Sequence, residues 1–136
     1  MFDGFAAVPN VAVFRQQADA LVQLLQDAPL TPEQMTGDLD FQQSLSQLFT
    51  LIPYAQLILE QARIEQVPQD IVDLVFETLI RDFSTTAIEL HGKDSSTDAQ
   101  QAWALATIRK PVIEPERADR VYSEVRALAG SYAMPR

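Results

Sequence analysis

His91 is the first residue to examine for chemistry, because it is the only histidine in the 136 residues. It stands in Ile88-Glu89-Leu90-His91, with a glutamate two positions before it. Di-iron carboxylate bundles need that glutamate three positions before the histidine, so that both ligands share one helix face. That position is Ile88 here, and the pattern has no second copy. We therefore interpret His91 as a residue in the last turn of a helix, where histidine suits the helix dipole.

Acidic residues cluster around a break between two long apolar segments. Carboxylates can act as general acids or bases, or as calcium ligands. The alternating oxygen ligands, central glycine and terminal glutamate of an EF-hand loop are missing here. We expect a solvated acidic face, made of Glu60, Glu65, Asp70, Asp73 and Glu77.

Arg81 and Asp82 are adjacent charges in the middle of an apolar segment. One of the two should point at least partly towards the core, so we expect a paired, hydrogen-bonded structural site. A functional anion site is the alternative. The serines and threonines nearby lack the flanking glycines of a nucleophile elbow. The four glycines are too scattered to form a glycine-rich phosphate loop.

Basic residues gather in the last third of the chain. Coenzyme A or another phosphate could attract them, and this is one interpretation. The other is that they complement the acidic helices of the same chain. Two glutamates also lie four residues from Arg120, and they can neutralise it by pairing along the same helix. The residues concerned are Arg109, Lys110, Arg117, Arg120 and Arg126, with Glu116 and Glu124 as the helix partners.

The net charge of −9 is unevenly distributed. Before Lys93 there are three basic and thirteen acidic residues, a net charge of −10, whereas from Lys93 onward seven basic residues face six acidic ones. A strongly acidic surface repels phosphate backbones, which argues against a nucleic-acid partner. The division predicts a charged seam within one bundle or between two copies.

Cysteine is absent, which excludes disulfides and thiolate sites and fits a reducing cytoplasm. The N-terminal residues resemble neither a secretory signal nor a membrane span. The most apolar stretch, 48–59, is broken by Pro53 and reads as a core helix rather than a membrane segment. We expect a cytoplasmic protein with no membrane partner.

Apolar residues recur at helical spacing between proline and glycine breaks. A helix should begin at Pro9-Asn10 and end before Pro29, and a short one should lie between a capping box at Thr31 and Gly37. Four further helices are expected over about 40–66, 68–91, 96–111 and 114–130, with Gly92 as a C-terminal cap and a second capping box formed by Thr97 and Gln100.

The predicted fold is all-α, a single bundle of about five helices over residues 1–136, since no alternating strand pattern occurs. The 40–66 segment is apolar nearly all round, so we expect it to be the central helix, covered on several sides. Pro53 should kink it. Residues 1–8 are expected to be an irregular lead, 131–136 a C-terminal tail, and Trp103 part of the core.

Several segments of the chain are similar to a known family. They span about residues 41–134 and read Leu48-Phe49-Thr50-Leu51-Ile52-Pro53-Tyr54-Ala55-Gln56-Leu57-Ile58-Leu59-Glu60-Gln61-Ala62, Arg81-Asp82-Phe83-Ser84, Leu90-His91-Gly92-Lys93, Ser95-Ser96-Thr97, Ala99-Gln100-Gln101, Arg109-Lys110-Pro111-Val112 and Ala127-Leu128-Ala129-Gly130-Ser131-Tyr132-Ala133-Met134. Together they resemble the C-terminal region of actinobacterial acyl-CoA dehydrogenases.

The resemblance implies FAD-dependent α,β-dehydrogenation of an acyl-CoA, with a glutamate as the base. Those parts belong to an upstream catalytic core, and none of its flavin-contacting or catalytic motifs is matched here. The resemblance therefore implies a non-catalytic accessory or assembly domain that binds no cofactor by itself. Its expected partner is a second copy or an acyl-CoA dehydrogenase core.

Two alternatives stay open. Long helices also suit the effector-binding and dimerisation domain of a bacterial regulator, although a helix-turn-helix is missing. A small protein that binds a flavin or an acyl-CoA is the other alternative.

Overall fold

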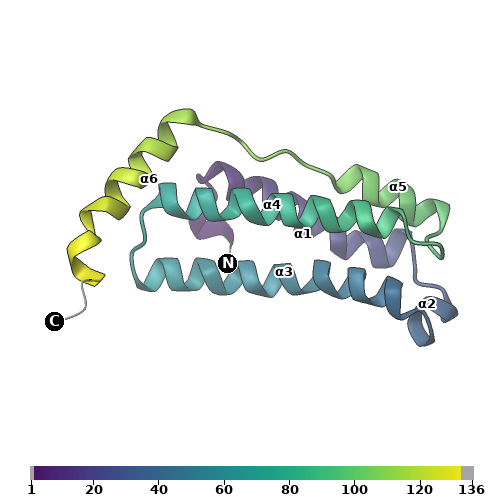
Figure 1. The fold of residues 1–136 in the computed structure, drawn as a ribbon. Coiled ribbons are helices and arrows are strands. Elements are labelled where there is room, and N and C mark those ends of the chain that lie inside the picture. Colours follow the sequence, from purple (N-terminus) through teal and green to yellow (C-terminus); the bar gives the residue numbers. More distant parts are fainter. Residues whose placement is uncertain (1, 133–136) are drawn as a thin grey trace.

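The computed structural model describes residues 2–132, and in this range the chain is all-α, as predicted (Figure 1). Six α-helices and two short 3-10 helices occur, and no strand is found among these residues. Their bounds are η1 Phe2–Phe5, α1 Pro9–Asp27, α2 Pro32–Thr36, α3 Leu39–Ile64, α4 Gln69–His91, α5 Asp98–Thr107, α6 Pro115–Ala127 and η2 Ala129–Tyr132.

Local capping chemistry sets most helix ends. Proline is the first residue of α1, α2 and α6, where its missing N–H costs nothing. Both predicted capping boxes form: Thr31 with Gln34 opens α2, and Thr97 with Gln100 opens α5. Gly92 ends α4, as expected.

Helix α5 ends at Thr107, earlier than the expected 111. Ile108 is extended, and Pro111 disfavours a helical conformation in the residue before it. Residues 108–114 therefore form a stretched connection to α6 instead of a last helical turn.

Helix α4 lies at the centre of the bundle. It packs against α1, α3 and α5 along its length and contacts the start of α6 (Figure 1). Three buried phenylalanines lie at its interface with α1: the ring of Phe14 meets Phe76 and Phe83 edge-on, with centroids 5.5 and 6.2 Å apart. Such aromatic pairs add to the burial of apolar area in stabilising the core.

The expectation that the 40–66 helix is covered on several sides is only partly correct, because α3 contacts α4, α2, α1 and η1 but one side of it stays open. Helix α3 packs mainly on α4, and it leaves Tyr54 55 % exposed and Leu57 64 % exposed on its outer side. The spacing of apolar residues in the sequence does not show which apolar face of a helix packs against a neighbour and which stays exposed. The helix continues through Pro53, and the kink stays a prediction.

The segments at the two ends differ in part from expectation. Residues 2–5 form the 3-10 helix η1, and Phe2 and Phe5 pack against the core, so the lead is not wholly irregular. The final helix ends at Ala127 rather than 130. Of the expected tail, residues 133–136 lie outside the described residues.

Trp103 is partly buried and packs against the core, and its indole N–H donates to the Ala20 carbonyl at 2.7 Å. No helix in residues 2–132 is both long enough and apolar enough to cross a membrane.

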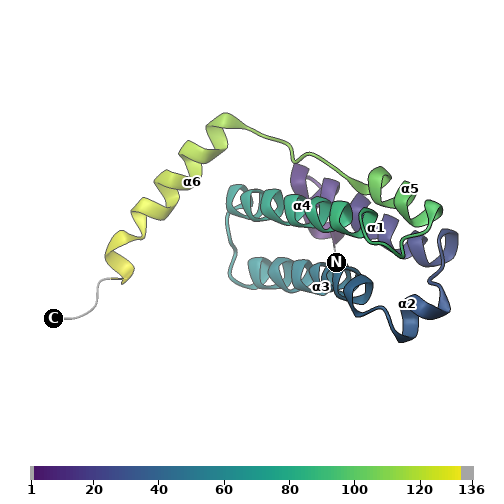
Figure 2. The ribbon, with the colours of Figure 1, turned by 45° about the vertical axis from the view of Figure 1, so that its right-hand side comes forward.

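Helix α6 runs obliquely past the end of the bundle where α3 and α4 are joined, and its last turns stand clear of the other helices (Figures 1 and 2). Among the helices α1–α5 it contacts only α4. Its only buried residues are Arg117 and Val121. The contacts that hold this helix in place define the first candidate site.

Candidate functional site

Arg117, in the first turn of α6, is a buried cation with two acidic partners on α4. Its side chain forms ion pairs with Asp73 and with Glu77, and it is only 2 % exposed. It also donates to the Val112 carbonyl at 3.3 Å. An arginine fork is suited to such paired contacts because it presents several donors in one plane. Helix α6 is thereby fixed to the first half of α4.

Asn10, at the start of α1, completes this network. Its backbone N–H donates to the Asp73 carboxylate at 2.8 Å. Its side-chain amide donates to the Asp73 and Val112 carbonyls and accepts from the Val112 N–H at 2.7 Å. The Asp73 carboxylate thus has partners from two helices, which offset the cost of burying its charge.

The connection between α5 and α6 is held by a second set of buried polar groups. The Ser84 hydroxyl donates to the Arg109 carbonyl and accepts from the Arg109 N–H, both at 3.0 Å. Gln17 on α1 donates to that hydroxyl and to the Thr107 carbonyl. These contacts and those of Asn10 hold the stretched connection against α1 and α4, so the place where α6 begins is well defined.

Sequence analysis missed Asn10 and Gln17. A signal was present: both lie within the apolar stripe of the first helix, which includes Val11 and Phe14. A polar side chain on a buried face needs a hydrogen-bond partner, and that requirement marks such positions.

Arg120 makes a second, more exposed connection from α6. Its guanidinium donates to both carboxylate oxygens of Asp70, at 2.7 and 2.9 Å, and to Glu114 at 2.9 Å. The hydrogen bond from Arg120 is the main cause that holds the pKa of Asp70 below its ordinary value. The same contact, with that to Glu114, raises the pKa of Arg120.

The helix pairs expected for Arg120 do not form in residues 2–132. Its partners are Asp70 and Glu114 rather than Glu116 and Glu124. A bidentate contact with a carboxylate on another helix has better geometry than a single pair along one helix.

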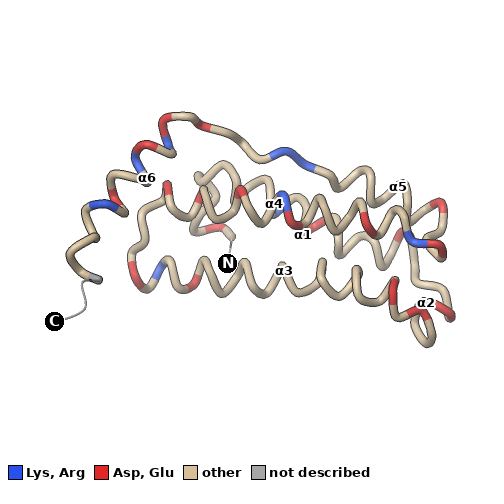
Figure 3. The backbone as a smooth tube through the Cα atoms, viewed as in Figure 1, with Lys and Arg blue, Asp and Glu red and all other residues tan. Residues whose placement is uncertain are grey.

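The expected solvated acidic face is only partly correct. Asp73 is buried, and Asp70, Asp73 and Glu77 are neutralised by arginines of α6. Glu60 and Glu65, on and just after α3, remain exposed. Figure 3 shows the basic residues of α6 and the acidic residues of early α4 at the same end of the molecule. A charged seam therefore lies within one copy of the chain.

The expectation that Arg81 or Asp82 points towards the core is wrong, because both side chains are exposed. The apolar stripe of α4 runs through Phe76, Ile80 and Phe83, which turns positions 81 and 82 away from the core. Arg81 pairs with Glu77 at 2.8 Å, and this carboxylate also holds Arg117.

The other predicted site residues are not brought to the Arg117 cluster. His91 is the last residue of α4 and is half-buried. Arg109 is exposed and its guanidinium donates to the carbonyls of Ala106 and Ile108, near the end of α5. Lys110 is exposed and has no ion pair within residues 2–132. In the described part of the chain, no group of three acidic or histidine side chains is placed to hold a metal ion.

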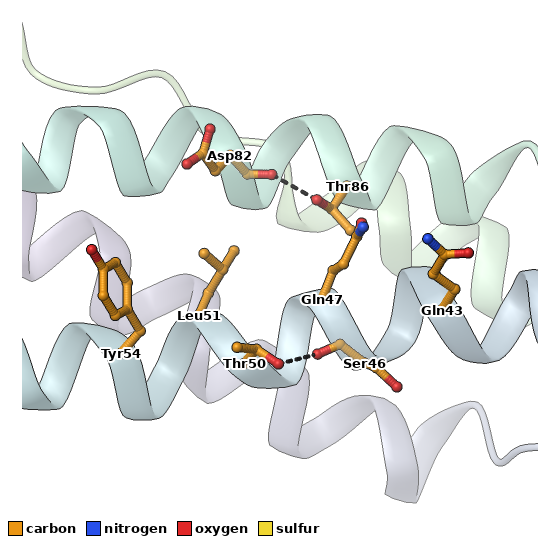
Figure 4. Close-up of a pocket in the computed structure, with 8 residues that line it drawn as sticks. All are labelled: Gln43, Ser46, Gln47, Thr50, Leu51, Tyr54, Asp82 and Thr86. Atoms are coloured by element: carbon orange, nitrogen blue, oxygen red, sulfur yellow. Dashed lines mark hydrogen bonds between the residues drawn. The ribbon is translucent and has the colours of Figure 1, made fainter.

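A groove between α3 and α4 is the second candidate site (Figure 4). Its volume is about 550 Å³, and Asp82 is the one charged residue among those that line it. The hydroxyls of Thr50 and Thr86 donate to carbonyls of their own helices, at 2.8 and 2.9 Å. The lining residues are Gln43, Ser46, Gln47, Thr50, Leu51, Tyr54, Asp82 and Thr86.

A smaller hollow of about 190 Å³ continues between the same two helices, near their connection. Its lining is apolar apart from one glutamine and comprises Ile58, Gln61, Ala62, Val67, Ile71, Val72 and Val75. The outer side of the α3–α4 pair thus carries two hollows, and Tyr54 and Leu57 of α3 are exposed.

A comparison with protein-family models found no match, and searches of curated proteins and of solved structures found no similar protein. The resemblance to acyl-CoA dehydrogenases therefore remains an expectation from the sequence.

Proposed function

We propose that this chain is a non-catalytic helical assembly domain, which binds another protein through helix α6. One observation carries the proposal: α6 is anchored at its first turn by the buried Arg117, while an apolar stripe on it has no partner in residues 2–132. The stripe consists of Ala118, Tyr122 and Val125, at the spacing of one helix face.

The exposure of the stripe supports a contact with protein. Tyr122 is 66 % exposed and Val125 is 55 % exposed, and Leu128 adds further apolar surface in the next turn. Tyrosine at the centre of a patch is typical of residues that dominate binding energy. Because the ion pairs of Arg117 and Arg120 hold the helix in one orientation, little ordering remains to oppose binding.

The sequence resemblance suggests which proteins to test as partners. They are the flavoprotein core of an acyl-CoA dehydrogenase and a second copy of this chain. In the first case the core would supply FAD and the catalytic glutamate, and this chain would contribute assembly. The lack of cysteine supports the cytoplasm as its location.

The test compares the full chain with the double variant Tyr122→Glu/Val125→Glu. Light scattering after gel filtration measures self-association, and a pull-down with purified acyl-CoA dehydrogenases measures binding to a flavoprotein. We expect the wild-type chain to show at least one of the two, and the variant to lose it.

The matched control is Val22→Glu, on an exposed apolar position of α1. It should leave binding unchanged. The proposal is wrong if the wild-type chain stays monomeric and binds no flavoprotein, or if the Tyr122→Glu/Val125→Glu variant and the wild type bind alike.

A further inference from the structure

The groove on the outer side of α3 and α4 has the form of a binding site for a helix. On α3, positions 43, 47, 50, 54, 58 and 61 recur every three or four residues along the two hollows. On α4, positions 71, 75, 82 and 86 follow the same periodicity. Two neighbouring helices with such stripes on one side present ridges and grooves against which a third helix packs.

Helix α6 of the same chain does not reach this groove. Arg117 and Arg120 hold its first two turns on the first half of α4. Within residues 2–132, α6 has no contact with α3, and its last turns lie beyond the end of the bundle in both views (Figures 1 and 2). The apolar stripe of α6 is therefore not covered by the groove of its own chain.

Helix α6 is short enough to lie along the two hollows. Helix α6 has 13 residues, which is about 20 Å at 1.5 Å per residue. The two hollows lie along α3 between Gln43 and Ala62, a span of about 28 Å by the same rise. One copy of α6 fits within it.

Charge also matches. Asp82 is the one charged residue that lines the two hollows. Arg126 lies one turn after Tyr122, beside the stripe of α6, and has no ion pair in the described part of the chain. An arginine and a carboxylate brought together at the edge of an apolar contact favour one register over others.

We infer that the groove binds helix α6 of a second copy of this chain, and that the exchange is reciprocal. Each copy then places its Ala118, Tyr122 and Val125 against α3 and α4 of the other. A two-fold axis relates the two identical contacts and closes the dimer. This is recognition of an amphipathic helix in a groove, and it rests on the proposed function, for which it names the partner.

Two variants separate the two surfaces. The arm variant is Tyr122→Glu/Val125→Glu, and the groove variant is Gln47→Arg/Thr50→Arg. All four side chains are exposed, so both variants should fold. Analytical ultracentrifugation of the full chain should show a wild-type dimer, and each variant alone should dimerise at least about tenfold more weakly.

The decisive measurement is the equimolar mixture of the two variants. Helix α6 is intact in the groove variant, and the groove is intact in the arm variant. A mixed dimer of the two therefore keeps one of its two contacts. We expect the mixture to associate more tightly than either variant alone. Val22→Glu, on the exposed side of α1, should dimerise like the wild type.

Each other outcome overturns the inference in a distinguishable way. A groove variant that dimerises normally while the arm variant does not means that α6 pairs with α6. A mixture no tighter than its components also overturns the exchange. A monomeric wild-type chain that binds a flavoprotein through the arm leaves the proposed function standing but excludes the second copy as partner.

Discussion

Arg117 on α6 forms a buried ion pair with Asp73 on α4, 44 residues earlier in the chain. The same aspartate accepts the backbone N–H of Asn10 on α1. Three helices therefore meet at one carboxylate. This contact sets the direction in which α6 leaves the bundle, and with it the exposure of the stripe on which both proposals rest.

Replacing Arg117 should be costly. Arg117→Ala leaves the buried Asp73 without its cation, and we expect a loss of about 3–5 kcal/mol in the free energy of unfolding. Urea denaturation followed by circular dichroism measures it. Arg120→Ala, which breaks the exposed contacts to Asp70 and Glu114, is the control and should cost much less. Equal losses in the two variants would contradict the assignment of Arg117 as the anchor.

The two capping boxes are joined through their glutamines, and this contact should be sensitive to truncation. Gln34 and Gln100 are fully buried and donate to each other's amide oxygens at 2.8 and 2.9 Å. Gln100→Ala leaves the Gln34 amide short of a partner, which should cost about 1–3 kcal/mol, plus the loss of the cap. Gln16→Ala, at an exposed position of α1, should leave the urea midpoint nearly unchanged. A similar midpoint for both variants would contradict the prediction.

The turn from α3 to α4 carries local strain at Gln66. This residue has φ of 53°, in the left-handed region, and follows the cap residue Glu65. The Val67 N–H donates to the Ala62 carbonyl at 2.9 Å, the bond of a Schellman motif, in which glycine usually occupies the position of Gln66. Gln66→Gly should therefore stabilise the chain by about 0.5–1 kcal/mol, as a rise in urea midpoint. Gln66→Ala keeps a Cβ and should give no such rise. A similar rise in urea midpoint for Gln66→Ala would show that backbone strain is not the cause of the stabilisation.

Stability should fall in acid through a few identified carboxyls. A hydrogen bond from Arg120 lowers the pKa of Asp70, one from Ser95 lowers that of Asp38, and one from Arg15 lowers that of Asp3. A lowered pKa means that the unfolded chain binds the proton more tightly. The stabilisation is therefore complete above the ordinary aspartate pKa of about 3.9 and is lost as the pH falls through the lowered values.

Thermal melts between pH 7 and pH 2.5 measure this dependence. We expect a melting temperature that changes little above about pH 5 and decreases below about pH 4. Asp38→Asn should lose part of this decrease, because its side chain no longer titrates. An Asp38→Asn curve parallel to the wild type would contradict the role of that group.

The purified chain should be colourless after incubation with FAD. The pyrophosphate of FAD is anionic, whereas the charge that lines the groove is the carboxylate of Asp82, and the chain before Lys93 has a net charge of −10. Absorption spectra of the protein peak after gel filtration test this. A flavin band that elutes with the protein would contradict the prediction.

The sequence by itself determined the helices and most of their ends. Thr31 with Gln34, Thr97 with Gln100, and Gly92 act through hydrogen bonds that reach three or four residues, so the signal and its partner are adjacent in the chain. The prediction that the basic last part of the chain pairs with the acidic first part was also correct, because the uneven distribution of charge can be counted from the sequence.

Only the tertiary structure decided which charges and which faces meet. Asp73 was one of five similar acidic residues, and its neighbours in the sequence do not identify it as the partner of Arg117. Asn10 bonds to Val112, 102 residues away. The outer face of α3 also carries large apolar residues, Tyr54 and Leu57, and packing against α4 and the other helices decided which apolar residues were covered. Helix ends depend on bonds within one turn of the chain, whereas the anchor of α6 and the open groove depend on the summed packing of all the helices.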